Sequence, residues 1–222
     1  KIDSKSKIII IGDYDADGAT ATACGYLALK KFGANVEFIV PNRFMFGYGL
    51  TPEIVDLANK QKPELIITVD NGIASIEGVK KANSYGIDVL ITDHHLPAKD
   101  LPDAKFIVNP NQSACHFPSK NLCGVGVIFY VLLSLRKELR KLNRYLTEPE
   151  PILSDLLDLV ALGTIADLVK LDFNNRILVN YGIKKIRSGN CNFGIEALAR
   201  LSKIKLEHIK TSDLSFSIAP KI

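Results

Sequence analysis

Cysteine is scarce in this chain of 222 residues, and its spacing excludes several classes of protein. Cys24, Cys115, Cys123 and Cys191 form no C-x-x-C pair. A chain this long and this rich in apolar residues does not need a disulfide framework, and the stretch CHFPSKNLC lacks the ligand spacing of a zinc site. We therefore expect a cytoplasmic protein whose cysteines stay reduced.

Long hydrophobic runs and a recognisable targeting signal are also lacking. The first residues, KIDSKSK, lead directly into a short apolar segment, which is not the pattern of a secretory signal. The longest largely apolar stretch, 122–135, has 14 residues and two glycines. It is shorter than the roughly 20 residues that a membrane span needs, so it predicts a buried helix and no membrane association.

Charge is modest overall but unevenly distributed. The net charge is +4. Residues 1–118 hold 12 basic and 14 acidic side chains, whereas residues 119–222 hold 16 basic and 10 acidic ones. This asymmetry would suit a polyanionic substrate held by the second half of the chain.

Short β-branched runs alternate with helical patterns in the first half of the chain. The predicted strands are 7–13, 35–41, 64–70, 88–93 and 105–109, and the predicted helices are 19–33, 51–60 and 75–86. Thr51 and Pro52 form a typical N-cap and first helical position. Apolar strands that alternate with helices indicate an α/β fold, a parallel sheet with helices on both faces.

The pattern becomes mainly helical after Pro118. Helices are predicted at 122–146, 152–166, 174–188 and 193–201, with the TEPEP segment, 147–151, as a linker. The last segment, LSFSIAPKI at 214–222, has the composition of an apolar strand without a polar tail. It indicates a chain cut from a longer protein.

Three aspartates, Asp13, Asp15 and Asp17, follow the first predicted strand at alternate positions. Like charges this close raise the free energy by up to a few kcal/mol unless a cation lies between them. An EF-hand loop is excluded, because its twelfth position would be Cys24 instead of a bidentate Glu, and because a strand precedes the loop. A solvated turn that caps a helix remains an alternative for these three residues alone.

Acidic and imidazole groups recur at the ends of two further predicted strands, as Asp70 and as Asp93-His94-His95. The ends of parallel strands meet at one edge of the sheet, where open α/β folds bind ligands. Carboxylates with imidazoles suit Mn²⁺ or Mg²⁺, and the surplus of carboxylates suggests two ions that share a bridging Asp. The second of two adjacent histidines is better placed to donate to a phosphate or a leaving oxygen than to bind the same ion.

The segments DYDADG, VDNG and TDHH resemble motifs I to III of the DHH phosphoesterase superfamily. The segments 108–135 and 156–186, with SFSIAPKI, are similar to the RecJ family of bacterial single-strand-specific 5′→3′ exonucleases. The resemblance implies metal ligands at Asp15, Asp17, Asp70, His94 and Asp167, with Asp70 bridging and His95 acting on the phosphate. Asp13 is a further expected ligand, and Asp93 is expected to orient the histidines. Asp167 comes from the resemblance alone, since by composition Asp155 and Asp158 compete with it.

The same resemblance implies how the chain is organised and what it does. One DHH domain is expected over 1–222, with a metal-binding α/β core at 1–118 and a mainly helical part at 119–222 that carries motif IV. The family's DHH-associated domain and oligonucleotide-binding-fold region are absent from this sequence. The implied activity is metal-dependent hydrolysis of single-stranded DNA in DNA repair and recombination, with single-strand-binding protein and a helicase as expected partners.

Residues that bind the substrate cannot be assigned from the sequence. Phe44, Phe46 and Tyr48, flanked by Arg43 in RFMFGYG, are candidates to stack on bases. The alternative is a loop that packs its own apolar side chains.

Two other functions are compatible with parts of the pattern. Other DHH hydrolases act on short oligoribonucleotides, cyclic dinucleotides or pyrophosphate, but they enter the first motif with a histidine, where this chain has IIIG at 9–12. Degenerate DHH proteins serve as replication scaffolds, but they tend to lose the metal ligands, and every expected ligand position is filled here.

Overall fold

A five-stranded parallel sheet forms the centre of the first half of the chain. The computed structural model describes residues 1–222, apart from the side chain of Arg43. The strand order is β2-β1-β3-β4-β5, and every neighbouring pair is parallel. The strands are β1 (Lys7–Ile11), β2 (Asn35–Ile39), β3 (Leu65–Val69), β4 (Asp88–Thr92) and β5 (Phe106–Val108). The predicted α/β fold with a parallel sheet is confirmed.

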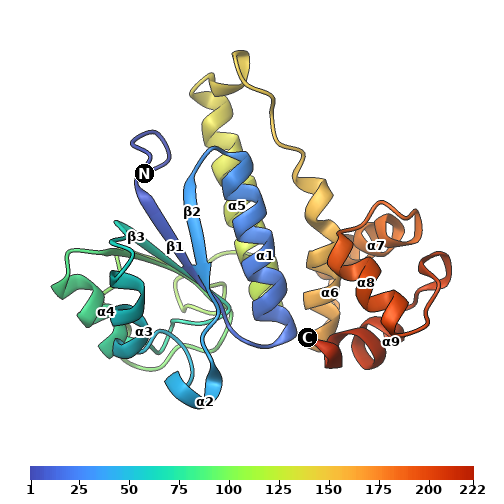
Figure 1. Ribbon diagram of the computed structural model, residues 1–222, viewed down its shortest axis with the longest axis horizontal. Coiled ribbons are helices and arrows are strands. Elements are labelled where there is room, and N and C mark those ends of the chain that lie inside the picture. The colour runs from blue at the N-terminus through green and yellow to red at the C-terminus, as the bar shows by residue number, and fades with distance from the viewer.

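The isoleucine run of β1 serves two cores because successive side chains of a strand point to opposite faces. Ile8 and Ile10 belong to the larger hydrophobic core, and Ile9 and Ile11 to the smaller one. The larger core includes α1 (Ala16–Lys31) and α5 (Gly124–Lys141), and the smaller one includes α3 (Pro52–Asn59) and α4 (Ile76–Ser84). Figure 1 shows these two helix layers on opposite sides of the sheet.

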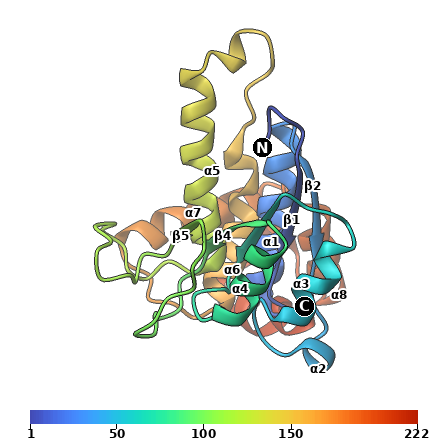
Figure 2. The same ribbon diagram turned by 90° about the vertical axis from the view of Figure 1, so that its left-hand side faces the viewer.

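The helices that follow α5 in the chain lie beyond α1, at the right of Figure 1. They are α6 (Leu157–Ala166), α7 (Phe173–Arg187), α8 (Phe193–Leu201) and the single turn α9 (Thr211–Asp213). Helix α6 packs against α1 on one side and α7 on the other, so it is buried almost all round. Short 3₁₀ turns occupy Arg144–Leu146, Leu153–Leu156 and Leu206–His208, and α2 (Arg43–Phe46) is one turn in the loop after β2. Figure 2 shows the far end of α5 extending beyond the rest of the molecule.

The strand predicted at 214–222 is wrong. This segment forms a π-helical turn, Leu214–Ile218, followed by a 3₁₀ turn, Ala219–Lys221. Leu214 and Ile218 are buried and Phe216 is exposed, so the apolar residues that matter are four apart, as on a helix, and not two apart. The composition suggested a strand because Leu214, Phe216 and Ile218 are all apolar and stand at alternate positions.

The predicted helix 122–146 is shorter than expected, because α5 ends at Lys141 and Asn143 then takes a left-handed conformation with φ 59°. Its apolar part is buried as predicted: Val125, Ile128 and Leu132 belong to the larger core. Among the described residues, no helix combines the length and the apolar character needed to cross a membrane.

The contact between α6 and α7 depends on a glycine. A Cβ added at Gly182 would overlap the carbonyl oxygen of Leu157 and the Cβ of Ala161. We therefore expect Gly182→Ala to lower the free energy of unfolding by about 1–3 kcal/mol, as overpacking does. The matched control is Gly194→Ala in α8, where no described atom lies within 4 Å of the added Cβ. It should raise the free energy of unfolding by up to about 1 kcal/mol.

Urea unfolding of both variants measures the difference. A Gly182→Ala protein as stable as the Gly194→Ala protein would contradict this account of the α6–α7 contact.

Candidate metal centre

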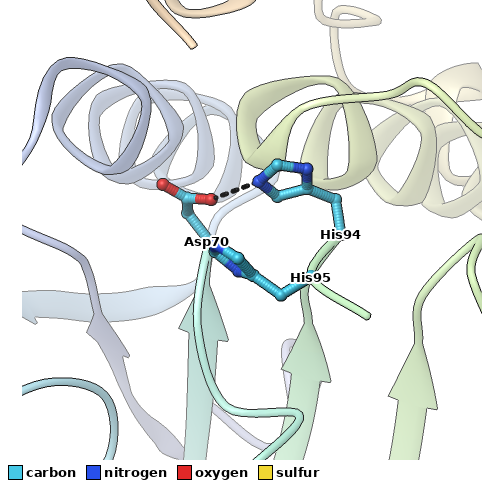
Figure 3. Close-up of side chains that lie close together, drawn as sticks. All are labelled: Asp70, His94 and His95. Atoms are coloured by element: carbon cyan, nitrogen blue, oxygen red, sulfur yellow. Dashed lines mark ion pairs between the residues drawn. The ribbon is translucent and has the colours of Figure 1, made fainter. Parts of the chain in front are cut away.

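The neighbouring strands β1, β3 and β4 end at one edge of the sheet, and each continues into a loop with candidate ligands. Asp13 and Asp15 follow β1, Asp70 follows β3, and His94 and His95 follow β4. Figure 3 shows Asp70 and His94 pointing toward each other above their strands, with His95 beside Asp70. The topology therefore brings the predicted site residues of all three loops together.

The loop after β1 holds its three carboxylates in different ways. Asp13 is buried and accepts a hydrogen bond from the main-chain N–H of Tyr14 at 2.7 Å. Asp15 is the N-cap of α1 and accepts from the N–H of Gly18 at 2.9 Å, so the capping role considered from the sequence is real for this residue. Gly18 leaves space that a Cβ would fill against Asp13.

Asp17 lies in the first turn of α1 and joins this loop to the second half of the chain. Its side chain is 2% exposed. One carboxylate oxygen accepts from the N–H of Gly124 at 2.5 Å and the other from the N–H of Val125 at 2.9 Å. These N–H groups have no partner within α5 because they belong to its first turn, where the helix dipole also favours an anion.

Asp70 stands in a strained backbone conformation. Its φ of 61° lies in the left-handed region, which costs a residue with a side chain on the order of 1–2 kcal/mol. Its N–H donates to the carbonyl of Thr92 at the end of β4 at 3.0 Å. The conformation directs the Asp70 carboxylate toward His94, and Asp70 Oδ1 lies 3.1 Å from His94 Nε2.

Asp93 is placed behind the two histidines. One of its oxygens accepts from the main-chain N–H groups of His94 and His95, and it lies 2.7 Å from His95 Nδ1. The other oxygen accepts from the N–H of Ile73 at 2.9 Å. Asp93 therefore fixes the His95 ring and the backbone that carries both imidazoles.

Asp167 reaches the same edge from the end of α6. Its Oδ2 lies 3.6 Å from His94 Nε2. The two aspartates that competed with it in the sequence have other partners. Asp158 accepts from the N–H and side chain of Asn192, and Asp155 pairs with Lys31 and Lys185.

Ligand atoms gather in three overlapping groups within the described residues. The members of each group lie within 4.8 Å of one another: Asp13-Asp15-Asp70, Asp70-His94-His95, and Asp17-His94-Asp167. Asp70 and His94 each belong to two groups. Asp70 Oδ1, His94 Nε2 and Asp167 Oδ2 are buried and have no hydrogen-bond partner among the described residues. Buried polar atoms normally have hydrogen bonds, so three ligand atoms that lack them and converge on one space fit a bound cation.

The pKa values of these groups are shifted by burial and by the neighbouring carboxylates. Burial raises the pKa of Asp17 to about 6, and burial together with the neighbouring Asp17 carboxylate raises the pKa of Asp167 to about 6. Burial, with the same neighbour, holds the pKa of Asp70 well above its usual range. Burial lowers the pKa of His94, so its imidazole is neutral near pH 7, which is the form that binds metals. A cation would stabilise every one of these carboxylates in its charged form.

The pKa of His95 is shifted in the opposite direction from that of His94. The hydrogen bond of His95 with Asp93 raises its pKa, which favours the imidazolium. Asp93 itself keeps a lowered pKa, because hydrogen bonds from His95 and the Ile73 N–H outweigh the effect of burial. The pKa values of the two adjacent histidines are thus shifted in opposite directions.

Two glycines near the site were not singled out by sequence reasoning. A Cβ at Gly124 would overlap the Asp70 side chain, and one at Gly163 would overlap Thr20 and lie 2.7 Å from Asp17 Oδ1. The only sequence signal was the family resemblance, whose segments 108–135 and 156–186 include Gly124 and Gly163. Gly124 lets the first turn of α5 approach Asp70, and Gly163 lets α6 approach Asp17.

The three aromatic candidates for stacking on bases differ in exposure and in their contacts. Phe44 is 96% exposed on α2, whereas Phe46 packs partly against the smaller core. Tyr48 is about half exposed and makes edge-to-face contacts with Tyr14 and His95, with ring centroids 6.4 and 6.0 Å apart. The side chain of Arg43 lies outside the described residues.

Comparisons with known proteins agree with this geometry. A model of the DHH family, N-terminal domain, matches residues 7–164. The chain therefore belongs to the DHH family, a class of phosphoesterases with this fold and this set of acidic and histidine motifs.

The particular resemblance to RecJ is confirmed by individual relatives. The chain is 51% identical over 219 residues to the single-stranded-DNA-specific exonuclease RecJ of Haemophilus influenzae, and 40% identical over 221 residues to that of Bacillus subtilis. These matches cover 98% and 100% of this chain but 38% and 26% of the relatives, so the chain spans well under half of their length.

Solved structures give the same result. An exonuclease RecJ bound to manganese matches with a TM-score of 0.84 at 33% identity, over 100% of this chain and 53% of that one. RecJ from Thermus thermophilus in complex with Mg²⁺ matches with a TM-score of 0.66 at 27% identity, over 100% of this chain and 26% of that one. RecJ structures thus bind both of the cations expected from the donor set.

The raised pKa values predict how stability depends on pH without metal. Carboxyl groups with a folded pKa of about 6 and an ordinary unfolded pKa bind more protons in the folded state, so their contribution is lost as the pH rises through 6. The raised pKa of His95 acts in the same direction, and the lowered pKa of His94 opposes it. We expect the metal-free protein to be more stable at pH 5 than at pH 7.5, by on the order of 2 kcal/mol.

Chemical unfolding in the presence of a chelator at the two pH values measures this difference. Asp167→Asn, which removes one of the titrating groups, should reduce it. Greater stability at pH 7.5 than at pH 5 would contradict the assignment of a repulsive acidic cluster.

Proposed function

We propose that this chain forms the metal-binding part of a single-strand-specific DNA exonuclease that hydrolyses phosphodiester bonds from the 5′ end. The observation that carries the proposal is the convergence of the unpaired ligand atoms of Asp70, His94 and Asp167 at one sheet edge. The likeness to single-stranded-DNA-specific exonucleases supports the substrate, and the polarity is carried over from the family resemblance of the sequence motifs. The proposed location is the cytoplasm, in keeping with free thiols at all four cysteines.

The proposed ligands are six side chains from four segments of the chain. They are Asp13, Asp15, Asp17, Asp70, His94 and Asp167. We infer two ions, Mn²⁺ or Mg²⁺, because the ligand atoms fall into more than one group and Asp70 is common to two of them. Such ions, when bound, would stabilise both the attacking and the leaving oxygen of a phosphoryl group.

The other residues act on the substrate or on the ligands. His95, held by Asp93 and favoured as imidazolium, would donate a hydrogen bond to the scissile phosphate or to the leaving oxygen. Asp93 positions this imidazole and remains ionised. Asp17 presents its carboxylate from a fixed position because both of its oxygens are held by the first turn of α5.

Phe44 supports single-stranded DNA as the substrate, since an almost fully exposed ring suits stacking on unpaired bases. The excess of basic side chains in residues 119–222 would favour a polyanion. Single-strand-binding protein and a helicase remain proposed partners of the whole protein.

The test is the activity of the whole protein that contains this chain. Asp70→Asn and His94→Ala should each reduce Mn²⁺-dependent release of 5′-mononucleotides from long single-stranded DNA by about three orders of magnitude, because several kcal/mol of charge stabilisation are lost. The matched control is Asp56→Asn, which removes an exposed carboxylate that pairs with Lys81 and Tyr85. It should retain full activity.

Product analysis decides between the proposal and its nearest rival. Mononucleotides from the 5′ end of long DNA support it. Undiminished degradation by the Asp70→Asn protein would contradict the proposed centre. Cleavage confined to short oligoribonucleotides, cyclic dinucleotides or pyrophosphate would contradict the proposed substrate.

A further inference from the structure

Asn71 is a buried side chain that joins the ends of two strands of the sheet. It is 1% exposed, and its Nδ2 donates to the carbonyls of Ile11 at 3.2 Å and Val69 at 2.8 Å. Ile11 is the last residue of β1 and Val69 is the last residue of β3. One carboxamide therefore ties together the two strand ends that lead into the Asp13–Asp17 loop and into Asp70.

The main chain of the same turn is held from its other side. Thr68 Oγ1 donates to the carbonyl of Asn71 at 2.7 Å, and both residues are buried. Gly72 has a φ of 114°, and a Cβ at this position would lie 2.5 Å from Thr68 Oγ1. The sequence Asp-Asn-Gly is thus fixed by contacts on both sides of Asp70.

This bracing explains how Asp70 keeps its left-handed conformation. A residue with a side chain holds a positive φ only where its surroundings over-determine it. Asp70 is also the member that the groups Asp13-Asp15-Asp70 and Asp70-His94-His95 share. A change in its backbone would therefore move a ligand out of both groups at once.

We propose that Asn71 is a positioning residue for the metal centre: its carboxamide bridges the β1 and β3 ends and holds Asp70 in the conformation that places its carboxylate beside Asp13 and Asp15 on one side and His94 on the other. The inference rests on the proposed function of those groups as a metal centre. Asn71 acts through main-chain carbonyls, so its loss changes the arrangement of the ligands while every ligand is retained.

A matched control exists elsewhere in the chain. Asn175 in α7 is also fully buried, and its Nδ2 donates to two main-chain carbonyls, those of Asn121 at 2.6 Å and Lys170 at 3.0 Å. The Oδ1 atoms of Asn71 and Asn175 both lack a hydrogen-bond partner among the described residues. Replacing either asparagine by alanine removes the same chemistry, but only Asn71 ties the strand ends that carry the ligands.

The experiment compares Mn²⁺ binding of Asn71→Ala and Asn175→Ala with that of the unmutated chain, by titration calorimetry at a temperature well below each melting temperature. We expect both variants to melt at lower temperature. We expect the Kd for Mn²⁺ to rise by about 10- to 100-fold in Asn71→Ala, as losses behind metal ligands do, and to stay within about twofold in Asn175→Ala. An unchanged Kd in Asn71→Ala would overturn the inference, and so would an equal loss in Asn175→Ala.

Two further measurements cover the remaining outcomes. If Asn71→Ala does not fold, the isosteric variant Thr68→Val is used instead, because it removes the hydrogen bond to the Asn71 carbonyl. The Kd for Mn²⁺ should then rise, and an unchanged Kd would overturn the inference. If the unmutated chain itself binds no Mn²⁺, the proposed centre fails, and the positioning role is then judged from crystals of metal-free Asn71→Ala protein. There Asp70 should relax to a negative φ, and a φ that stays near 61° would overturn the inference.

Discussion

Mutual repulsion among carboxylates at one sheet edge is the constraint to which the rest of the molecule is fitted. Asp17 and Asp70 are each only 2% exposed, and water cannot screen them as it would on the surface. Part of the compensation comes from the protein itself, since the N–H groups of Gly124 and Val125 hold Asp17. The remainder is left uncompensated, because the facing atoms of Asp70, His94 and Asp167 have no hydrogen bonds within the part of the chain that the structure describes.

The fold solves the problem of assembling such a site from distant segments. Parallel strands deliver three loops to one edge, and α5 and α6 bring the remaining contacts from distant parts of the chain. Close approach of these helices requires glycine at two points, Gly124 against Asp70 and Gly163 against Asp17. The helical second half therefore belongs to the proposed metal centre as much as the sheet does, through Asp167 and through the first turn of α5.

Much of this could be predicted from the sequence, for physical reasons. The parallel sheet followed from apolar runs that alternate with helices, and the grouping of Asp70 with His94 followed from their positions at strand ends. The N-cap at Thr51 was also predictable, because its signal is local: its hydroxyl accepts from the Ile54 N–H. Composition failed at 214–222, where Leu214, Phe216 and Ile218 suggested a strand and tertiary packing buries Leu214 and Ile218 on one side of a helical turn.

The long-range parts of the site could not be predicted in this way. Nothing local distinguishes Asp167 from Asp155 or Asp158, and only the family resemblance selected it. Asn71 donates to a carbonyl 60 positions away in the sequence, and Asp70, with its left-handed conformation, donates its N–H to the carbonyl of Thr92 on another strand. Such features arise from the assembled fold, and no pattern of spacing records them.

Anomalous X-ray scattering at the manganese edge, on crystals of this chain soaked in Mn²⁺, would locate the bound ions among the carboxylates. We expect two peaks about 3.5–4 Å apart at the edge formed by β1, β3 and β4, both in contact with Asp70. A single peak, or peaks remote from Asp70 and His94, would contradict the assignment of these crowded carboxylates to a shared two-metal centre.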